Sequence, residues 1–269
     1  MCTCFVACAE VIHKFHEDED VCGVTLLNNE LYLLRLRNVD QIQVYSTDDF
    51  TLLRILSVPG LCAGVVKDIT SCVQKQCIYL ANSGETSCIY RVGLDRSVSK
   101  WPVRIRPSGL SVTRSSNLLV TCSEGLCKNG KLVELSSHNG NCVREIKLHA
   151  VIEWPRHAVQ MHNGQYVVCH GQGVIKNQVS QVGVDGRIIR SNIGDGGLNV
   201  PSHVSVNSDQ FVFVADTLNS RIVLFDPSLN YVRNVLEQMQ NMPMYVCFDD
   251  ATRRLYVGQQ NGIVSVVQL

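Results

Sequence analysis

The stretch Phe211–Asp226, FVFVADTLNSRIVLFD, decides the fold of this 269-residue chain. Its two apolar runs, Phe211–Ala215 and Arg221–Phe225, are rich in Val, Ile and Phe, which favour β-strands. The segment between them, Asp216–Ser220, contains Asp, Thr, Asn and Ser, which are typical of a tight turn. The sequence therefore predicts a β-hairpin at this place.

Imperfect copies of this hairpin, and of the segment before it, recur along the chain. The segment PSHVSV that begins at Pro201 has counterparts that begin at Pro107, Pro155 and Pro243. Their starts lie about 42–48 residues apart, which fits one four-stranded propeller blade per repeat. Two further units lack the proline and are predicted to begin at Val21 and Ala63.

The strand pattern of the repeats predicts how the ring closes. The sixth unit ends after three strands, and the unmatched segment Glu10–His16 at the other end of the chain supplies the fourth. We therefore predict an all-β fold, a six-bladed β-propeller with four antiparallel strands per blade, closed by the N-terminal strand that completes the last blade. The predicted blades form one domain, 1–269, with approximate bounds 21–60, 61–106, 107–154, 155–200, 201–242, and 243–269 together with 1–20.

Composition narrows the function classes and the compartment. Lys+Arg and Asp+Glu are both 24, so net charge gives no general reason to bind nucleic acid or a membrane surface. The 13 cysteines show no CxxC pair, and many stand inside apolar runs, where a free thiol packs as a small buried side chain. We expect a reducing, cytoplasmic compartment. The sequence shows neither a signal-peptide pattern nor an apolar run long enough to cross a membrane.

The segment Pro201–Asp226 resembles the NHL repeat, the unit of the six-bladed propellers found at the C-terminus of tripartite-motif NHL proteins. The resemblance is specific in this blade, whereas the other five match mainly in strand pattern. It implies a domain that binds a protein or RNA and that can belong to a larger multidomain protein. Asp216 and Arg221 carry the motif, and we expect them to stabilise the blade rather than to bind a ligand.

The loops that enter the first strands and those that join second to third strands share one face of a propeller, called here the channel-entry face. Loops carry function more often than strands do, so this face is the predicted binding surface. Its candidate binding residues are Arg37, Asn82, Arg156, His157, His170, His203, Asn219, Tyr245 and Gln259.

Two histidines on this face are also low-ranking candidates for a metal site. His157 and His203 occupy the same position in adjacent repeats, two residues after a proline, so both imidazoles are expected near the channel axis. Similar propellers, the peptidyl-hydroxyglycine amidating lyases, hold zinc with three channel histidines. Here the equivalent positions are Gly109 and Tyr245, and a third ligand, for which His170 or His149 could serve, is not evident.

The favoured prediction is a non-catalytic interaction module, not an enzyme, that binds a protein or peptide partner without a cofactor. Its basis is the lack of a nucleophile elbow, a zincin motif and a P-loop. An RNA-binding NHL domain is one alternative, weakened by few basic and aromatic residues. A metal-dependent lyase or hydrolase at His157 and His203 is the other. A monomeric domain without membrane contact is expected.

Overall fold

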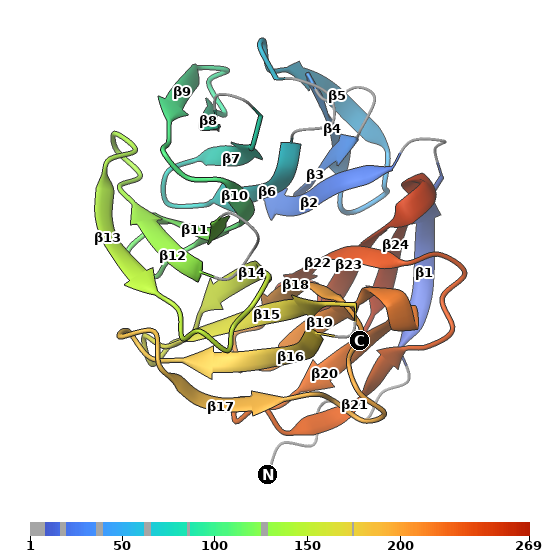
Figure 1. The fold of residues 1–269 in the computed structure, drawn as a ribbon. Helices are drawn as coiled ribbons and strands as arrows, with labels where there is room; N and C mark the ends of the chain where they lie inside the picture. Colours follow the sequence, from blue (N-terminus) through green and yellow to red (C-terminus); the bar gives the residue numbers. More distant parts are fainter. Residues whose placement is uncertain are drawn as a thin grey trace.

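The computed structural model describes residues 9–16, 20–35, 40–61, 66–84, 87–124, 129–173 and 175–269. Within these ranges, 24 strands form six four-stranded antiparallel sheets arranged as blades around one axis (Figure 1). The only helical segments in the described part of the chain are two 3₁₀ turns, η1 (Thr217–Asn219) and η2 (Gln260–Gly262). The predicted six-bladed propeller is confirmed.

Each blade runs from an inner first strand to an outer fourth strand. The blades, in order, are β2 (Val21–Leu27), β3 (Glu30–Arg35), β4 (Gln41–Ser46), β5 (Leu52–Ser57); β6 (Val66–Cys72), β7 (Cys77–Asn82), β8 (Cys88–Gly93), β9 (Val98–Pro102); β10 (Pro107–Val112), β11 (Leu118–Glu124), β12 (Asn129–Leu135), β13 (Cys142–Lys147); β14 (Pro155–Gln160), β15 (Tyr166–Gln172), β16 (Ile175–Val182), β17 (Ile188–Asn192); β18 (Pro201–Val206), β19 (Val212–Asp216), β20 (Arg221–Phe225), β21 (Tyr231–Leu236); and β22 (Pro243–Asp249), β23 (Arg254–Gln259), β24 (Val264–Gln268), β1 (Glu10–Phe15).

The two ends of the chain meet in the sixth blade. Strand β1 pairs antiparallel with β24, from Glu10 opposite Gln268 to Phe15 opposite Val264. This pairing confirms the predicted closure, and it leaves no blade of the ring incomplete.

The apolar core lies between the blades rather than in one central mass. Six clusters of buried side chains each join two neighbouring blades; for example, Tyr32 and Leu34 of β3 share a cluster with Leu80 of β7 and Tyr90 of β8. Burying a large apolar side chain contributes about 1.5–3 kcal/mol, so the six interfaces hold the ring together. The Asp and His side chains that line the channel axis do not belong to these six clusters.

A β-bulge recurs at the same place in every first strand. The register with the second strand shifts directly after the first residue of the strand in all six blades. A bulge re-aims the side chain that follows it, here toward the axis. The residues after the bulges form one layer, called here the channel ring: Gly23, Asp68, Gly109, His157, His203 and Tyr245.

The motif that resembles an NHL repeat forms a closed hydrogen-bond network in blade five. Asp216 is fully buried and accepts hydrogen bonds from Arg221 Nε at 2.6 Å and Asn219 Nδ2 at 2.8 Å. Arg221 Nη2 also donates to the carbonyl of Gly197 at 2.7 Å. These bonds tie the loop before β18 to the end of β19, which is the blade-stabilising role predicted for the motif.

Candidate metal centre in the channel

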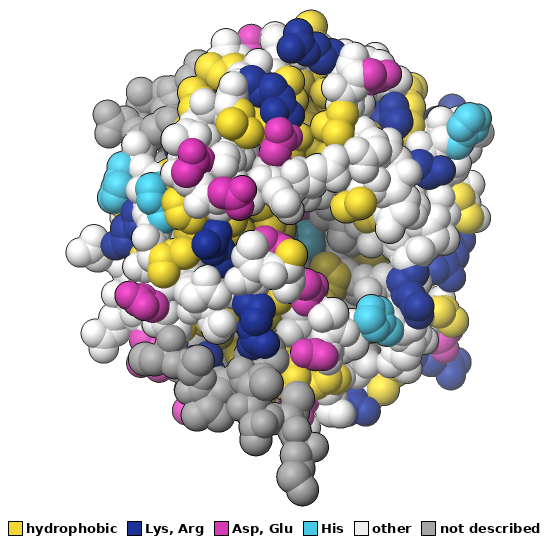
Figure 2. Space-filling model, turned by 180° about the vertical axis from the view of Figure 1, so that it is seen from behind, with side chains coloured by type: hydrophobic (Ala, Val, Ile, Leu, Met, Phe, Trp, Pro, Cys, Tyr) yellow, Lys and Arg dark blue, Asp and Glu magenta, His cyan; other side chains and the backbone are white. Residues whose placement is uncertain are grey.

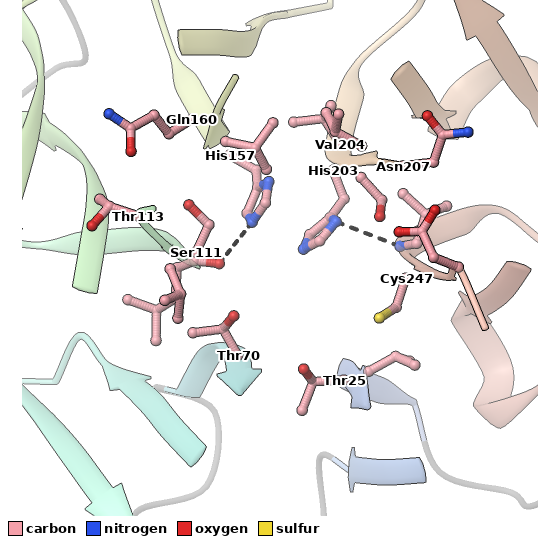
Figure 3. Close-up of a pocket in the computed structure, with 18 of the residues that line it drawn as sticks. Thr25, Thr70, Ser111, Thr113, His157, Gln160, His203, Val204, Asn207 and Cys247 are labelled. Atoms are coloured by element: carbon pink, nitrogen blue, oxygen red, sulfur yellow. Dashed lines mark hydrogen bonds between the residues drawn. The ribbon is translucent and has the colours of Figure 1, made fainter. Parts of the chain in front are cut away.

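The channel ring lies between two cavities. The entry cavity, about 700 Å³, opens where the first strands begin and has Asp68, His157, His203 and Tyr245 among its lining residues. The exit cavity, about 410 Å³, lies beyond the ring toward the other ends of the first strands and also touches His157 and His203. The two histidines therefore line both cavities, extending from β14 and β18 toward the axis (Figure 3).

Three members of the channel ring bring potential ligand atoms together. The Nε2 atom of His157 lies 3.5 Å from Oδ2 of Asp68, and Nε2 of His203 lies 3.6 Å from Oδ1 of the same carboxyl group. One potential ligand atom from each residue lies within 4.8 Å of the others. The imidazole rings stack with their centroids 3.7 Å apart and their planes at 22°.

Asp68 is held by backbone groups and lacks a cationic side chain. It is 1% exposed, and its two oxygens accept hydrogen bonds at 2.8 Å from the backbone N–H groups of Ile69 and Leu110. Among the described residues, its ion-pair contacts are the two histidines and include no Lys or Arg. A buried carboxylate is costly unless a cation or further donors compensate it, so this position suits a positive charge.

The surroundings of His157 favour its neutral imidazole form. Burial, and then the neighbouring His203, lower the pKa of His157 to about 3, against the opposing effect of Asp68. His157 Nε2 lies 2.8 Å from the carbonyl of Leu110, while its Nδ1 has no hydrogen-bond partner among the described residues. Nδ1 of His203 lies 3.5 Å from the backbone N of Val246, a long contact.

Two glycines of the channel ring lie where a side chain would collide with the neighbouring blade. A Cβ atom on Gly109 would lie 2.5 Å from the carbonyl oxygen of Arg156 and 2.9 Å from Cδ2 of His157. A Cβ atom on Gly23 would lie 2.5 Å from Cγ2 of Ile69. Gly109 therefore allows the imidazole of His157 to occupy its place beside Asp68.

The donor set fits a divalent metal ion. Two imidazoles and one carboxylate supply the three protein ligands of a catalytic zinc site or of a two-histidine, one-carboxylate site. Neutral imidazole is the form that binds metal, and the open side faces the entry cavity. Binding at Nε2 would move the His157 proton to its unpartnered Nδ1 and give up the bond to Leu110, and at His203 it would give up the long contact to Val246.

The structure gathers four of the nine predicted binding residues at the entry cavity: Arg156, His157, His203 and Tyr245. The ring of Tyr245 meets that of His203 edge-on at 5.5 Å, and burial, followed by Asp68, raises the pKa of its phenol well above the usual value. Two exposed basic side chains, Lys67 and Arg106, and the half-buried Trp154 also line this cavity.

Four other predicted residues make contacts within or beside their own blades. Asn82 accepts from the backbone of Gly84, His170 bonds Ser180, and Gln259 donates to Ser265. Asn219 belongs to the Asp216 network described above. Arg37 lies outside the described residues. A binding role for these five stays a prediction.

The third potential ligand, which the sequence comparison missed, is Asp68 rather than His170 or His149. His170 is bonded at Nε2 to Ser180 inside blade four, and Nδ1 of His149 accepts from the backbone of Val151. The comparison started the second unit at Ala63, whereas Val66 is the residue paired as Pro155 is in its blade. No proline marks the start of this unit, so Asp68 fell out of register with His157.

Charge is mixed on the face that Figure 2 shows. Lys and Arg side chains are interspersed with Asp and Glu around a central hollow, and the basic ones do not gather there into one patch (Figure 2). The RNA-binding alternative stays a prediction. Within the described part of the chain, no helix has the length and apolarity needed to cross a bilayer.

Comparison with known proteins supports the fold but not a family. No protein-family model and no curated protein sequence matches the chain. Virginiamycin B lyase from Staphylococcus aureus, solved as a catalytically inactive His-to-Ala variant with quinupristin, superposes with a TM-score of 0.68 at 11% identity, covering 97% of this chain and 99% of that one. A protein of unknown function from Bacteroides thetaiotaomicron gives a TM-score of 0.71 at 12% identity, with coverages of 97% and 75%.

These neighbours correct the expectation that the chain is not an enzyme. A streptogramin B lyase also shares the fold, with a TM-score of 0.68 over 97% of this chain at 10% identity. The same propeller, over almost its full length, thus serves as a catalyst, so inferring a non-enzymatic protein from missing motifs was wrong. At this identity the likeness shows the fold alone, and the resemblance to NHL repeats stays a prediction.

Proposed function

We propose that this chain is a metal-dependent lyase that acts in the entry cavity, with Asp68, His157 and His203 as the metal ligands. The observation that carries the proposal is the convergence of these three buried donors, from blades two, four and five, beside a cavity of about 700 Å³. Such volumes are typical of small-molecule sites. A divalent ion bound there would act as a Lewis acid on a substrate oxygen.

The surroundings favour elimination over hydrolysis. Asp68, His157 and His203 are only 1%, 3% and 7% exposed, so a substrate that fills the entry cavity would exclude the water that reaches them. A site that restricts water also protects a reactive intermediate from hydrolysis. The phenol of Tyr245 lines the same cavity and donates a hydrogen bond to the carbonyl of Lys67 at 3.1 Å; a substrate oxygen that displaced this carbonyl would accept the same bond. The lyases that share the fold add an analogy from architecture.

Metal titration tests the site directly. Isothermal titration of chelator-treated protein with Zn²⁺, Mn²⁺ and Mg²⁺ is expected to show one site for at least one ion. Asp68→Asn and His203→Ala should each weaken binding by at least about 10–100-fold, the loss that even outer-shell partners of a metal cause. Asp185→Asn, which alters an exposed carboxylate paired with Arg187, is the matched control and should bind normally. Absent binding, or equal binding by Asp68→Asn, would refute the centre.

A separate measurement tests the reaction class. Metal-loaded wild-type protein is incubated in ¹⁸O-water with quinupristin, the compound named with the lyase that shares the fold, and the masses of the products are measured by mass spectrometry. A lyase gives products without the label, whereas a hydrolase incorporates it. Labelled products, or no turnover by a protein that does bind metal, would overturn the lyase assignment while leaving the metal centre in place.

The same cavity supports a second candidate, binding of a peptide segment of a partner protein. Lys67, Arg106 and Arg156 bring positive charge to its wall, and Trp154 and Tyr245 bring aromatic surface. Aromatic and arginine side chains are enriched where proteins bind partners. Replacing Arg106 and Trp154 by Ala should reduce capture of a peptide partner without changing metal affinity. Unchanged capture would locate the partner surface elsewhere.

A further inference from the structure

The exit cavity has a second layer of side chains below the channel ring. Alternate residues of a strand point the same way, so the residues two positions after the channel ring also face the axis. This layer, called here the hydroxyl ring, consists of Thr25, Thr70, Ser111, Val159, Ser205 and Cys247, one from each blade, and all six line the exit cavity. Figure 3 shows Thr25, Thr70, Ser111 and Cys247 around the central space, with the two histidines beside them.

The hydroxyl groups are only partly engaged by the protein. Ser111 Oγ donates to the carbonyl of Ala158 at 2.7 Å, and Thr25 Oγ1 donates to Ser71 Oγ at 3.1 Å, so both oxygens keep lone pairs. Ser205 Oγ accepts from the backbone N–H of Phe248 at 3.1 Å, which leaves its hydrogen to donate. Thr70 makes no side-chain hydrogen bond with any residue that the structure describes. The cavity therefore offers both donors and acceptors.

The exit cavity carries almost no net charge. Its charged lining residues, among those described, are Arg114 and Asp250, which are of opposite sign. Both already have partners in the lining, because Arg114 bonds the carbonyl of His162 and Asp250 accepts from Ser208. Valine, isoleucine and leucine side chains fill the spaces between the polar groups. A charged ligand would lose its hydration here without gaining an opposite charge.

We propose that the exit cavity is a second ligand site, distinct from the metal centre, that takes an uncharged molecule rich in hydroxyl or amide groups. Such groups both donate and accept, as the hydroxyl ring requires. The volume of about 410 Å³ lies in the range of small-molecule sites, roughly 300–1,000 Å³. This site does not depend on the proposed lyase activity, although its ligand would lie against His157 and His203.

Protein-observed NMR titration tests the site. The probes are three neutral compounds, myo-inositol, D-glucose and nicotinamide, and one charged counterpart, nicotinate. At least one neutral probe is expected to shift the amide signals of Thr70, Ser111 and Ser205 saturably, with a Kd of about 1 mM for a molecule of about a dozen non-hydrogen atoms. Nicotinate should not shift them. No saturable shift with any neutral probe, or equal binding of nicotinate, would overturn the proposal.

Two variants locate the binding. Thr70→Val removes one unengaged hydroxyl and should weaken binding about 2–10-fold, the effect of one neutral hydrogen bond. Thr121→Val is the matched control, since Thr121 is a buried threonine that does not line the cavity, and it should bind like wild type. Val159→Phe fills the cavity and should abolish the shifts. Wild-type affinity in both Thr70→Val and a folded Val159→Phe would overturn the site.

Discussion

Two buried aspartates of this propeller differ in what surrounds them. Asp216 of blade five accepts from Arg221, from Asn219 and, at 2.6 Å, from the backbone N–H of Asn199. Asp68 of blade two is as deeply buried but has two backbone donors, and its nearest side-chain nitrogens are imidazole atoms at 3.5 and 3.6 Å. One carboxylate is compensated within its own blade, and the other faces the channel.

The contrast between Asp216 and Asp68 shows that the residues of a recognisable sequence motif need not be the ones positioned for chemistry. Blade five resembles a known repeat through Asp216, Asn219 and Arg221. These residues form hydrogen bonds with one another, so they stabilise the fold. Asp68 and His157, which follow first-strand bulges, are bonded to backbone groups, and Nδ1 of His157 has no partner among the described residues. Chemistry is therefore expected where buried polar groups are positioned but not fully paired.

The largest expected effect comes from making the same substitution at both aspartates. Asp216→Asn should lower the free energy of unfolding by about 3–5 kcal/mol, because it breaks a buried ion pair and leaves Arg221 uncompensated. Asp68→Asn in metal-free buffer should cost only about 1 kcal/mol, because relief of an uncompensated charge partly offsets the loss of one backbone hydrogen bond. Urea denaturation measures both.

The control for that pair of variants is an aspartate at the surface. Asp185→Asn should change the free energy of unfolding by less than about 0.5 kcal/mol, since Asp185 and Arg187 are 57% and 85% exposed. If Asp68→Asn destabilises the protein as much as Asp216→Asn does, Asp68 is a structural residue and the contrast between the two regions fails.

The next prediction concerns the free energy of unfolding at low pH, which depends on the buried histidines. Burial lowers the pKa of His157 to about 3 and that of His170 to about 4, whereas an unfolded histidine titrates near 6.5. The unfolded chain thus binds protons that the folded chain refuses, so this contribution to stability is present above pH 6.5 and is lost as the pH falls toward 4. Each histidine should cost about 1.4 kcal/mol per pH unit within that window.

Urea titrations at pH 7.5, 6.5 and 5.5 measure this dependence. His157→Gln and His170→Gln should each remove about half of the slope that the two histidines cause. A His157→Gln variant with the wild-type slope would show that His157 is protonated in the folded protein, which contradicts a neutral metal ligand.

The last comparison tests the clearance around His157. Gly109→Ala should lower the free energy of unfolding by about 1–3 kcal/mol through overpacking, and it should also weaken metal binding, because the added methyl group meets the imidazole. Gly258→Ala, whose Cβ would lie 2.9 Å from Val24, is the matched control and should lose stability while keeping metal affinity. Equal metal affinity in the two variants would mean that Gly109 does not position His157.

The repeat pattern was enough to predict the architecture. Alternating apolar strands, turn residues at regular intervals and the proline that begins four of the first strands predict six blades, and the incomplete last repeat predicts the pairing of β1 with β24. These features are local in sequence, or they follow from counting units. The alignment of His157 with His203 likewise comes from local similarity around Pro155 and Pro201.

The third ligand depended on information that the sequence carries only weakly. Position on the axis is set by the bulge after the first residue of each first strand, and in blade two nothing like Pro155 marks that residue. An error of three residues removed Asp68 from comparison with the histidines. The expectation of a non-enzymatic protein failed for a related reason, since searching for contiguous motifs overlooks a site assembled from one residue in each of several blades.

The residues of the channel ring and those of the apolar interfaces that stabilise the fold are largely separate sets. Each blade contributes one residue of the channel ring at the axis, while the six apolar interfaces that hold the blades together lie elsewhere. These positions are not independent, because a side chain at Gly109 of blade three would collide with the imidazole of His157 in blade four. Redesign of the channel ring should therefore substitute adjacent residues in pairs, a large residue together with the small neighbour that leaves space for it.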